Sequence, residues 1–79
     1  MQKLVLYSRP ECHLCDAVVQ RLQPLLAGRP VALEIVDVDS NVALERRYGL
    51  RIPVLVAGDI EVSGYPLDEA RVRHYLDSL

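Results

Sequence analysis

Two residues separate Cys12 from Cys15, and the 79-residue chain has no other cysteine. A bond between them would close a very short loop, which constrains the unfolded chain far less than a long-range cross-link would. The pair is therefore poorly placed to stabilise a fold. A dithiol with this spacing can instead exchange with the disulfide of another molecule, with one thiolate attacking and the second cysteine resolving the mixed disulfide.

The chain that carries this pair has an ordinary globular composition. Hydrophobic residues make up 51% and charged residues 25%, which predicts one folded domain over residues 1–79. The net charge is -2 with both signs interspersed, so no basic field attracts phosphate groups or anionic lipid. We therefore expect a monomer without nucleic-acid or membrane partners.

The first ten residues do not have the pattern of a targeting segment. Their apolar run is too brief for a signal peptide, and no small-residue cleavage site follows it. No stretch approaches the length that crosses a bilayer. These observations predict a cytoplasmic protein. Thiols are kept reduced in the cytoplasm, so a persistent structural disulfide between Cys12 and Cys15 would be unusual there.

Periodicity predicts the elements that position the cysteines. Lys3 to Ser8 is a short apolar run typical of a buried strand, and Pro10 ends it. From His13 onward the apolar residues recur at the spacing of one face of an amphipathic helix, namely Cys15, Val18, Val19, Leu22 and Leu26. Pro24 is expected to kink this helix or to end it near Gln23.

A second strand and a short helix follow. Val31 to Val38 is rich in β-branched residues and predicts a strand. A helix from Ala43 to Tyr48 is expected to stop at Gly49. Good candidates for its N-cap are Asp39, Ser40 and Asn41.

A hairpin and a last helix complete the chain. Ile52 to Ala57 and Ile60 to Ser63 flank Gly58-Asp59, where glycine at the first central position suits a two-residue type II′ turn. The segment from Pro66 to Leu79 has apolar residues at helical spacing. The order βαβαββα predicts an α/β fold with a mixed four-stranded sheet and flanking helices, in which the first two strands are parallel.

This order places the cysteine pair at the opening of the first helix. The unpaired N–H groups and the dipole of a helix N-terminus stabilise a thiolate, here that of Cys12. Arg9 and His13 are candidates to add positive charge beside this sulfur. Cys15, one turn later, joins the apolar face of the helix. We predict that Cys12 is the exposed nucleophile and Cys15 the shielded resolving cysteine.

Over essentially its whole length the chain resembles a glutaredoxin of the thioredoxin superfamily. The resemblance is carried by the CxxC pair at a strand-to-helix junction, by the segment RIPVL with Ile52 and Pro53, and by the later turn with Gly64. It implies a thioredoxin-like fold with Cys12 and Cys15 as catalytic residues. It also implies a cis peptide bond at Pro53, beside the cysteines, and backbone groups at Ile52 that contact the thiol substrate.

The chain departs from typical glutaredoxins around the expected glutathione site. The residues between the cysteines are His and Leu rather than Pro and Tyr, so an aromatic wall is missing. After the glycine of the later turn, the sequence YPLDE replaces the polar residues that hold the γ-glutamyl group, and Asp68 substitutes for them only if the turn shifts register. The residues assigned to substrate contact, including Arg51 as a carboxylate partner, are Arg9, His13, Leu14, Arg51, Ile52, Pro53 and Gly64.

We therefore expect an enzyme, a thiol–disulfide oxidoreductase that acts on protein disulfides or glutathionylated substrates. Glutathione or a flavoprotein reductase would reduce the enzyme's disulfide after each turnover. No bound cofactor is expected, and glutathione is the candidate co-substrate. Two alternatives stay open. A zinc site takes four ligands, and this segment supplies only Cys12, His13 and Cys15. The first alternative is therefore an iron–sulfur cluster that two chains share. The other alternative is a binding module that kept the fold and lost turnover.

Overall fold

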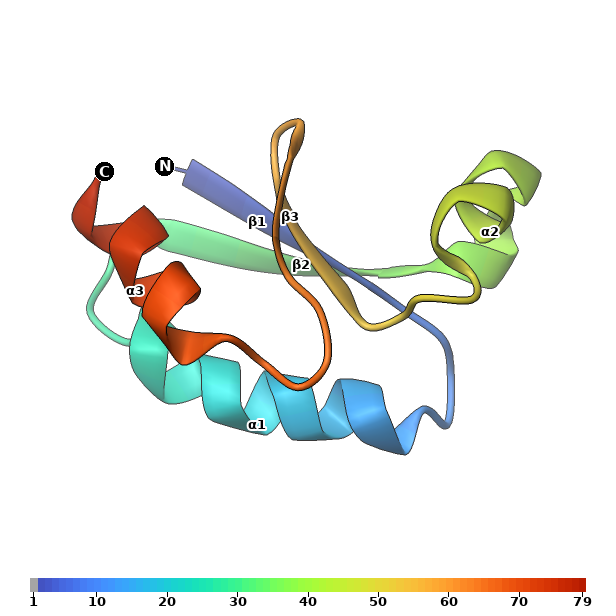
Figure 1. Ribbon diagram of the computed structural model, residues 1–79, viewed down its shortest axis with the longest axis horizontal. Helices are drawn as coiled ribbons and strands as arrows, with labels where there is room; N and C mark the ends of the chain where they lie inside the picture. Colours follow the sequence, from blue (N-terminus) through green and yellow to red (C-terminus); the bar gives the residue numbers. More distant parts are fainter. Residues whose placement is uncertain (1) are drawn as a thin grey trace.

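The computed structural model describes residues 2–79, and its elements follow the predicted order (Figure 1). Within this range no helix has the length and apolar character needed to span a membrane. The elements are β1 (Gln2–Ser8), α1 (His13–Leu26), β2 (Val31–Asp37), a 3₁₀ turn (Val38–Ser40), α2 (Val42–Tyr48), β3 (Val54–Ala57), β4 (Ile60–Ser63) and α3 (Glu69–Asp77).

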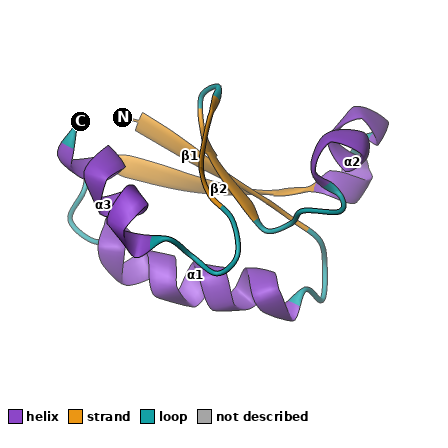
Figure 2. Cartoon of the chain, viewed as in Figure 1, coloured by secondary structure: helices purple, strands orange, loops and turns teal. Residues whose placement is uncertain are grey.

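The four strands form one sheet in the order β2-β1-β3-β4. β1 and β2 are parallel, whereas β3 is antiparallel to both β1 and β4. This topology confirms the predicted α/β fold with a mixed four-stranded sheet. Figure 2 shows α1 running along one side of the sheet with α3 beside it, and α2 set apart at the other end of the molecule from α3.

The larger core lies between the sheet and the helices α1 and α3. Leu6 of β1 pairs in register with Leu55 of β3, and Leu4 shares their face because alternate residues of a strand point the same way. The packing of this face against α1 fixes the helix that begins at the cysteine pair. The buried residues of this core are Leu4, Leu6, Val18, Leu22, Leu55, Val62, Val72 and Leu76.

α2 covers a smaller cluster on the opposite face of the sheet. Tyr7 of β1, which alternates with Leu6, stacks on Tyr48 at the end of α2 with ring centroids 4.2 Å apart and planes inclined by 13°. Arg47 lies over the outer ring, with its guanidinium carbon 5.3 Å from the Tyr48 centroid. These contacts hold α2 against the sheet. The buried residues of this cluster are Val38, Tyr48, Val54 and Val56.

Pro24 lies inside α1 and does not end it. Of the predicted kink or stop near Gln23, the stop was wrong. A proline inside a helix removes the hydrogen bond of its missing N–H and crowds the carbonyl four residues earlier, but α1 continues to Leu26. The N–H of Ala27 then donates to the Gln23 carbonyl at 3.1 Å. Leu25 and Leu26 pack against the larger core, so burial holds a last turn that the local sequence disfavours.

Two strand boundaries also differ from the prediction. The strand from Val31 ends at Asp37, because Val38 begins the 3₁₀ turn that leads toward α2. The strand expected from Ile52 begins only at Val54. The proline before Val54 has no N–H to donate to a neighbouring strand, which is a physical reason for the later start.

The predicted cap and turn signals are confirmed. Asn41 is the N-cap of α2, and its side chain accepts hydrogen bonds from the backbone N–H groups of Ala43 and Leu44. In the β3–β4 turn Gly58 has a φ of 61°, and Asp59 does not share this left-handed conformation. A positive φ at the first central position alone is the signature of a type II′ turn.

Candidate active site

Cys12 is the N-cap residue of α1, where the loop after β1 meets the helix. Its φ of -92° and ψ of 106° are extended, as is usual for an N-cap. The Cys12 sulfur accepts a hydrogen bond from the backbone N–H of Cys15 at 3.2 Å. Sulfur therefore takes the place of the oxygen of an ordinary cap, and the N–H groups of the first turn favour its thiolate form.

A disulfide joins Cys12 and Cys15, with their α-carbons 5.2 Å apart. Cys15 is only 2% exposed and lies on the helix face that also carries Val18 and Leu22. Cys12 is half-buried at the surface. Cys15 is shielded, as the sequence predicted, whereas Cys12, predicted to be exposed, is only partly so. The attacking and resolving roles of the two cysteines stay predictions.

A tight loop of residues 9–12 connects β1 to α1. Within it Glu11 has a φ of 61°, and it is the only residue other than glycine in the left-handed region between residues 2 and 79. That region disfavours an L-amino acid with a side chain by roughly 1–2 kcal/mol. The surrounding structure must therefore hold Glu11 in this conformation, which turns the chain so that Cys12 reaches the cap position.

Arg9 does not bring an uncompensated positive charge to Cys12. Its Nε donates a hydrogen bond to Oδ2 of Asp39 at 2.9 Å, and this bond raises the pKa of Arg9 above its ordinary value. Asp39 lies in the 3₁₀ turn after β2. The pair ties the loop before Cys12 to that turn, and the carboxylate offsets the charge that the sequence assigned to thiolate stabilisation.

His13 and Leu14, the residues between the cysteines, are both exposed. Leu14 leaves 45% of its surface open and so presents an apolar patch next to the redox pair. Between residues 2 and 79 no group of three or more His, Cys, Asp or Glu side chains is arranged to hold a metal ion.

Pro53 and Gly64 lie close together, and the cis bond that the resemblance to glutaredoxins implied at Pro53 is confirmed. The Ile52–Pro53 peptide bond is cis. Pro53 is buried, and a Cβ placed on Gly64 would lie 3.7 Å from the Pro53 carbonyl oxygen. The segment before β3 and the segment after β4 thus form one surface. Ile52 is half-buried and packs against the smaller cluster under α2.

Arg51 already has partners within the chain. Its Nη1 donates to both carboxylate oxygens of Glu61, at 2.9 and 3.0 Å, and its Nη2 donates to the Arg47 carbonyl at 3.3 Å. Its guanidinium carbon also lies 5.6 Å from the ring centroid of Tyr48. A substrate carboxylate would therefore compete with Glu61 for this side chain.

The loop that replaces the polar glutathione anchors leads into the cap of α3. The Asp68 carboxylate accepts a hydrogen bond from the Arg71 N–H at 3.0 Å, and the Asp68 N–H donates to Oγ of Ser63 at 2.9 Å. The Tyr65–Pro66 peptide bond before it is cis, a feature the sequence did not predict. Asp68 thus serves as the N-cap of α3.

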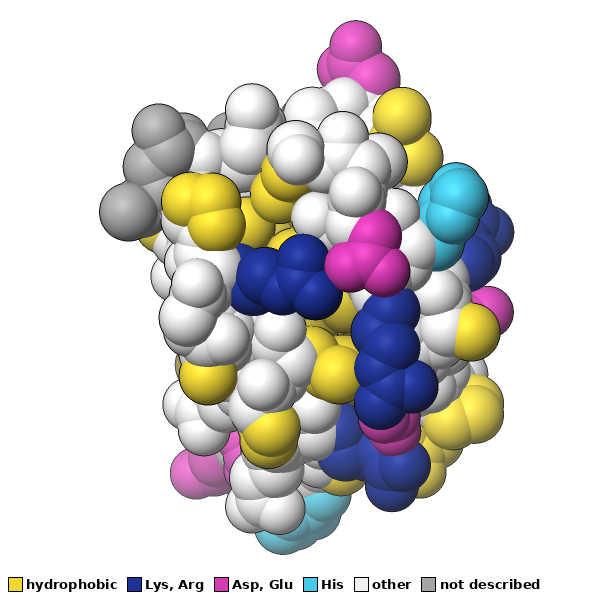
Figure 3. Space-filling view, turned by 90° about the vertical axis from the view of Figure 1, so that its left-hand side faces the viewer, with side chains coloured by type: hydrophobic (Ala, Val, Ile, Leu, Met, Phe, Trp, Pro, Cys, Tyr) yellow, Lys and Arg dark blue, Asp and Glu magenta, His cyan; other side chains and the backbone are white. Residues whose placement is uncertain are grey.

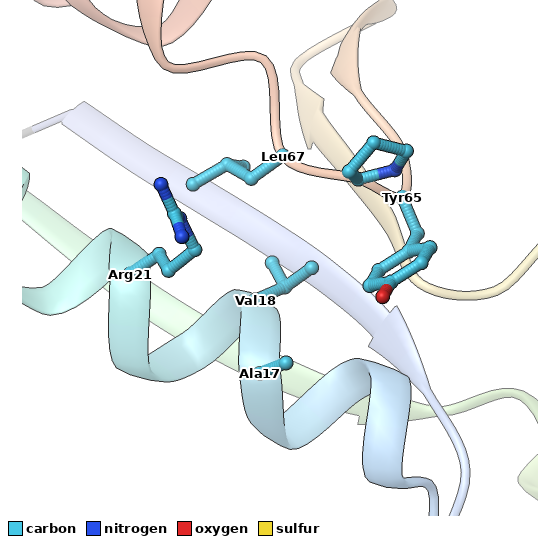
Figure 4. A pocket seen from close by; sticks show the side chains of 6 residues that line it. Ala17, Val18, Arg21, Tyr65 and Leu67 are labelled. Carbon is cyan, nitrogen blue, oxygen red and sulfur yellow. The ribbon is translucent and has the colours of Figure 1, made fainter.

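A groove of about 290 Å³ lies between α1 and this loop (Figure 4). No sequence prediction placed α1 against this loop. The available signals were the small Ala17 beside the apolar stripe of α1 and the aromatic Tyr65 directly after Gly64, but neither shows from sequence alone that the two segments face each other. The residues that line the groove are Ala17, Val18, Arg21, Tyr65, Pro66 and Leu67.

No curated protein matches this chain, whereas several solved structures do. Among solved structures, the crystal structure of target protein XcR50 from X. campestris is 43% identical, with 96% of this chain and 97% of that chain covered and a TM-score of 0.76.

The solution structure of protein Ne2328 from Nitrosomonas europaea is 39% identical, with 95% of this chain and 91% of that chain covered and a TM-score of 0.85. The profile of the family described as glutaredoxin-like domain (DUF836) matches residues 3–77. The chain therefore belongs to the glutaredoxin-like domain family.

Proposed function

We propose that this protein is a thiol–disulfide oxidoreductase that works through Cys12 and Cys15. The observation that carries the proposal is the disulfide at the N-terminus of α1, with Cys12 as the cap and Cys15 buried behind it. A structural cross-link over so short a separation adds little stability. A reactive pair, in contrast, needs this position, because the helix terminus favours the attacking thiolate.

The proposed cycle begins with the reduced protein. The Cys12 thiolate attacks one sulfur of a substrate disulfide, the substrate bond breaks, and the second substrate sulfur leaves as a thiolate that takes a proton from solvent. Cys15 then loses its proton and attacks the Cys12 sulfur, which releases the first substrate sulfur as a thiol. Two electrons and two protons pass to the substrate, and the Cys12–Cys15 disulfide remains.

A thiol reductant must restore the dithiol, and either two equivalents of glutathione or a flavoprotein reductase supplies the electrons. A reducing compartment such as the cytoplasm is the setting in which this cycle runs in the reducing direction.

We further propose that protein disulfides, rather than glutathione mixed disulfides, are the main substrates. A γ-glutamyl group carries an ammonium and a carboxylate, and each needs a partner of opposite charge or a polar group. Three features of this chain work against that. Arg51 is engaged by Glu61, the Asp68 carboxylate caps α3, and Pro66 has no N–H to donate. Each missing hydrogen bond to a charged group weakens binding by about tenfold or more.

The test compares two assays on the same preparation. One follows reduction of a protein disulfide with a thioredoxin-type reductase as the electron source, and the other follows removal of glutathione from a glutathionylated peptide with glutathione as reductant. We expect faster turnover in the first assay. If neither assay shows turnover, the proposed oxidoreductase activity is contradicted. Brisk turnover that saturates with glutathione in the second assay contradicts only the proposed substrate preference.

A further inference from the structure

The groove between α1 and the β4–α3 loop has the size of a side-chain subsite. Its volume of about 290 Å³ is at the lower limit of small-molecule sites, which span roughly 300–1,000 Å³. In Figure 4 the ring of Tyr65 and the side chain of Leu67 project from the loop toward α1, with Val18 between them. The space between the two segments suits one large side chain better than a cofactor.

The groove begins close to the redox pair. Ala17 follows Cys12 by five residues, which corresponds to about 7.5 Å along a helix axis. A peptide in extended conformation advances about 3.3 Å per residue. When the cysteine of a bound segment lies at Cys12, the residue two positions away is therefore at the right distance to place its side chain in the groove.

The walls of the groove carry one charged side chain, and Glu69, which also pairs with Arg73, offsets part of its charge. Arg21 is the one charged residue among those that line it, and its Nε donates to Oε2 of Glu69 at 3.0 Å, with a second bond from its Nη2 to the same oxygen. Val18, Pro66 and Leu67 supply apolar surface, and Tyr65 is 52% exposed at the edge. An uncharged apolar side chain matches this lining.

The rim of the site is acidic. Glu11 directly precedes Cys12, Asp16 directly precedes Ala17, and both are exposed and form no ion pair with any of residues 2–79. Arg9 pairs with Asp39 at 2.9 Å, while Arg21 shares the single negative charge of Glu69 with Arg73, whose Nη2 lies 3.6 Å from Oε1 of Glu69. The two charges of Glu11 and Asp16 exceed the one surplus positive charge of this group, so the rim carries a net negative charge that favours a positively charged partner.

The opposite end of the molecule carries paired charges. Figure 3 views this end, where Lys and Arg side chains lie beside Asp and Glu side chains. Arg29, for example, pairs with Asp77 at 2.9 Å.

We propose that the groove and its acidic rim bind a segment of a substrate protein in which a large apolar side chain lies two residues from the reacting cysteine and a Lys or Arg lies beside it. The proposal rests on the oxidoreductase function and names the class of disulfide that it reduces. Glutathione does not fit this description, because it has two carboxylates, one ammonium and no apolar side chain. Charge complementarity is what selects a basic segment over other occupants of an apolar groove.

Synthetic peptides test the proposal. Each has one cysteine in a disulfide with 2-mercaptoethanol, a neutral leaving thiol. The first peptide has leucine two positions from the cysteine on both sides, with lysines beside the leucines. The second replaces the lysines by glutamates, and the third replaces the leucines by alanines. The reduced protein attacks the peptide sulfur, mercaptoethanol leaves, and Cys15 releases the peptide thiol.

We expect the first peptide to react about tenfold faster than the third, because burial of a leucine side chain is worth about that factor. The first peptide should also react several-fold faster than the second, and added salt should shrink this difference. Glutathione disulfide should react more slowly than the first peptide. Equal rates for the three peptides, or a faster reaction of glutathione disulfide, overturn the proposal.

Two pairs of variants locate the effect. Asp16→Asn should lower the rate ratio of lysine to glutamate peptides, whereas Asp59→Asn, the same change in the β3–β4 turn, should not. Ala17→Phe fills the groove and should remove the preference for leucine, whereas Ala17→Ser leaves it open. Because each ratio compares two peptides on the same variant, a change in Cys12 reactivity affects both rates equally and cancels. If all four variants leave the peptide rate ratios unchanged, the proposed site is overturned. A protein that reacts with no disulfide contradicts the oxidoreductase function itself.

Discussion

The N-termini of α1 and α3 are capped by different chemistry. α3 begins after Asp68, whose carboxylate accepts the Arg71 N–H at 3.0 Å, and α1 begins after Cys12, whose sulfur accepts the Cys15 N–H at 3.2 Å. A carboxylate is a strong acceptor at neutral pH, whereas sulfur is a weak one unless it is a thiolate. The cap of α3 therefore serves stability, whereas under the proposed function the cap of α1 gives up some stability for reactivity.

Replacement of the cysteines should have the largest effect on this contrast. Cys12→Ser supplies a good cap but no nucleophile, so disulfide exchange should be lost completely. Cys15→Ser keeps the nucleophile and should accumulate mixed disulfides at Cys12, because nothing resolves them. Mass spectrometry after exposure to a disulfide measures both outcomes. Adducts that form equally well on Cys15 in the Cys12→Ser protein would contradict the assigned roles.

The reduced protein should become more stable as pH rises. The N–H groups of α1 favour the Cys12 thiolate, so the pKa of Cys12 should be lower in the folded than in the unfolded state. The resulting stability is present above the unfolded-state pKa and is lost as pH falls through the folded-state pKa. It amounts to about 1.4 kcal/mol for each unit between the two values.

Urea unfolding of the reduced protein at several pH values, together with thiolate absorbance, measures this effect. Cys12→Ser is the control, since its free energy of unfolding should lack the rise. A Cys12 pKa equal to that of free cysteine, titrated in parallel, would mean that the helix terminus does not activate the sulfur.

Loss of the α3 cap should affect stability alone. Asp68→Ala removes the acceptor for the Arg71 N–H and should lower the free energy of unfolding by about 1 kcal/mol. Asn41→Ala, which removes the matching cap of α2, should have a similar effect. Denaturant unfolding and exchange rates are measured on both variants. An exchange rate that falls in Asp68→Ala but not in Asn41→Ala would show that Asp68 also contributes to the redox site.

The smallest effect should come from the ion pair beside Cys12. Asp39→Asn removes the charge that offsets Arg9, so the Cys12 pKa should fall further, and added salt should reverse the shift because both side chains are exposed. Arg9→Gln combined with Asp39→Asn should cancel it. The Cys12 pKa is measured by titration at low and high salt in the unchanged protein, in Asp39→Asn and in the double variant. An unchanged pKa in Asp39→Asn would show that Arg9 does not reach the sulfur.

The element order and the N-cap of α2 followed from the sequence because they depend on local signals. Apolar spacing marked α1, Asn41 marked the start of α2, and Gly58 marked the hairpin turn. The cis bond at Pro53 came from the resemblance to glutaredoxins rather than from any local preference.

The features that the sequence did not reveal depend on contacts between distant residues. Burial of Leu25 and Leu26 carried α1 past Pro24, against the local preference. Arg51 pairs with Glu61, which the sequence did not reveal, because the hairpin brings β4 beside the segment before β3. The groove likewise exists only where α1 and the β4–α3 loop meet, so no single segment encodes it.

The stacked rings of Tyr7 and Tyr48 give this protein an optical reporter. The chain has no tryptophan and no phenylalanine, so its four tyrosines alone account for the aromatic side-chain signal in the near ultraviolet. Two rings 4.2 Å apart and nearly parallel couple their electronic transitions, and one belongs to the sheet while the other belongs to α2. In the reduced protein, where no disulfide adds to this region, circular dichroism near 280 nm therefore reports the attachment of α2 to the sheet without a label, separately from the backbone signal of the helices.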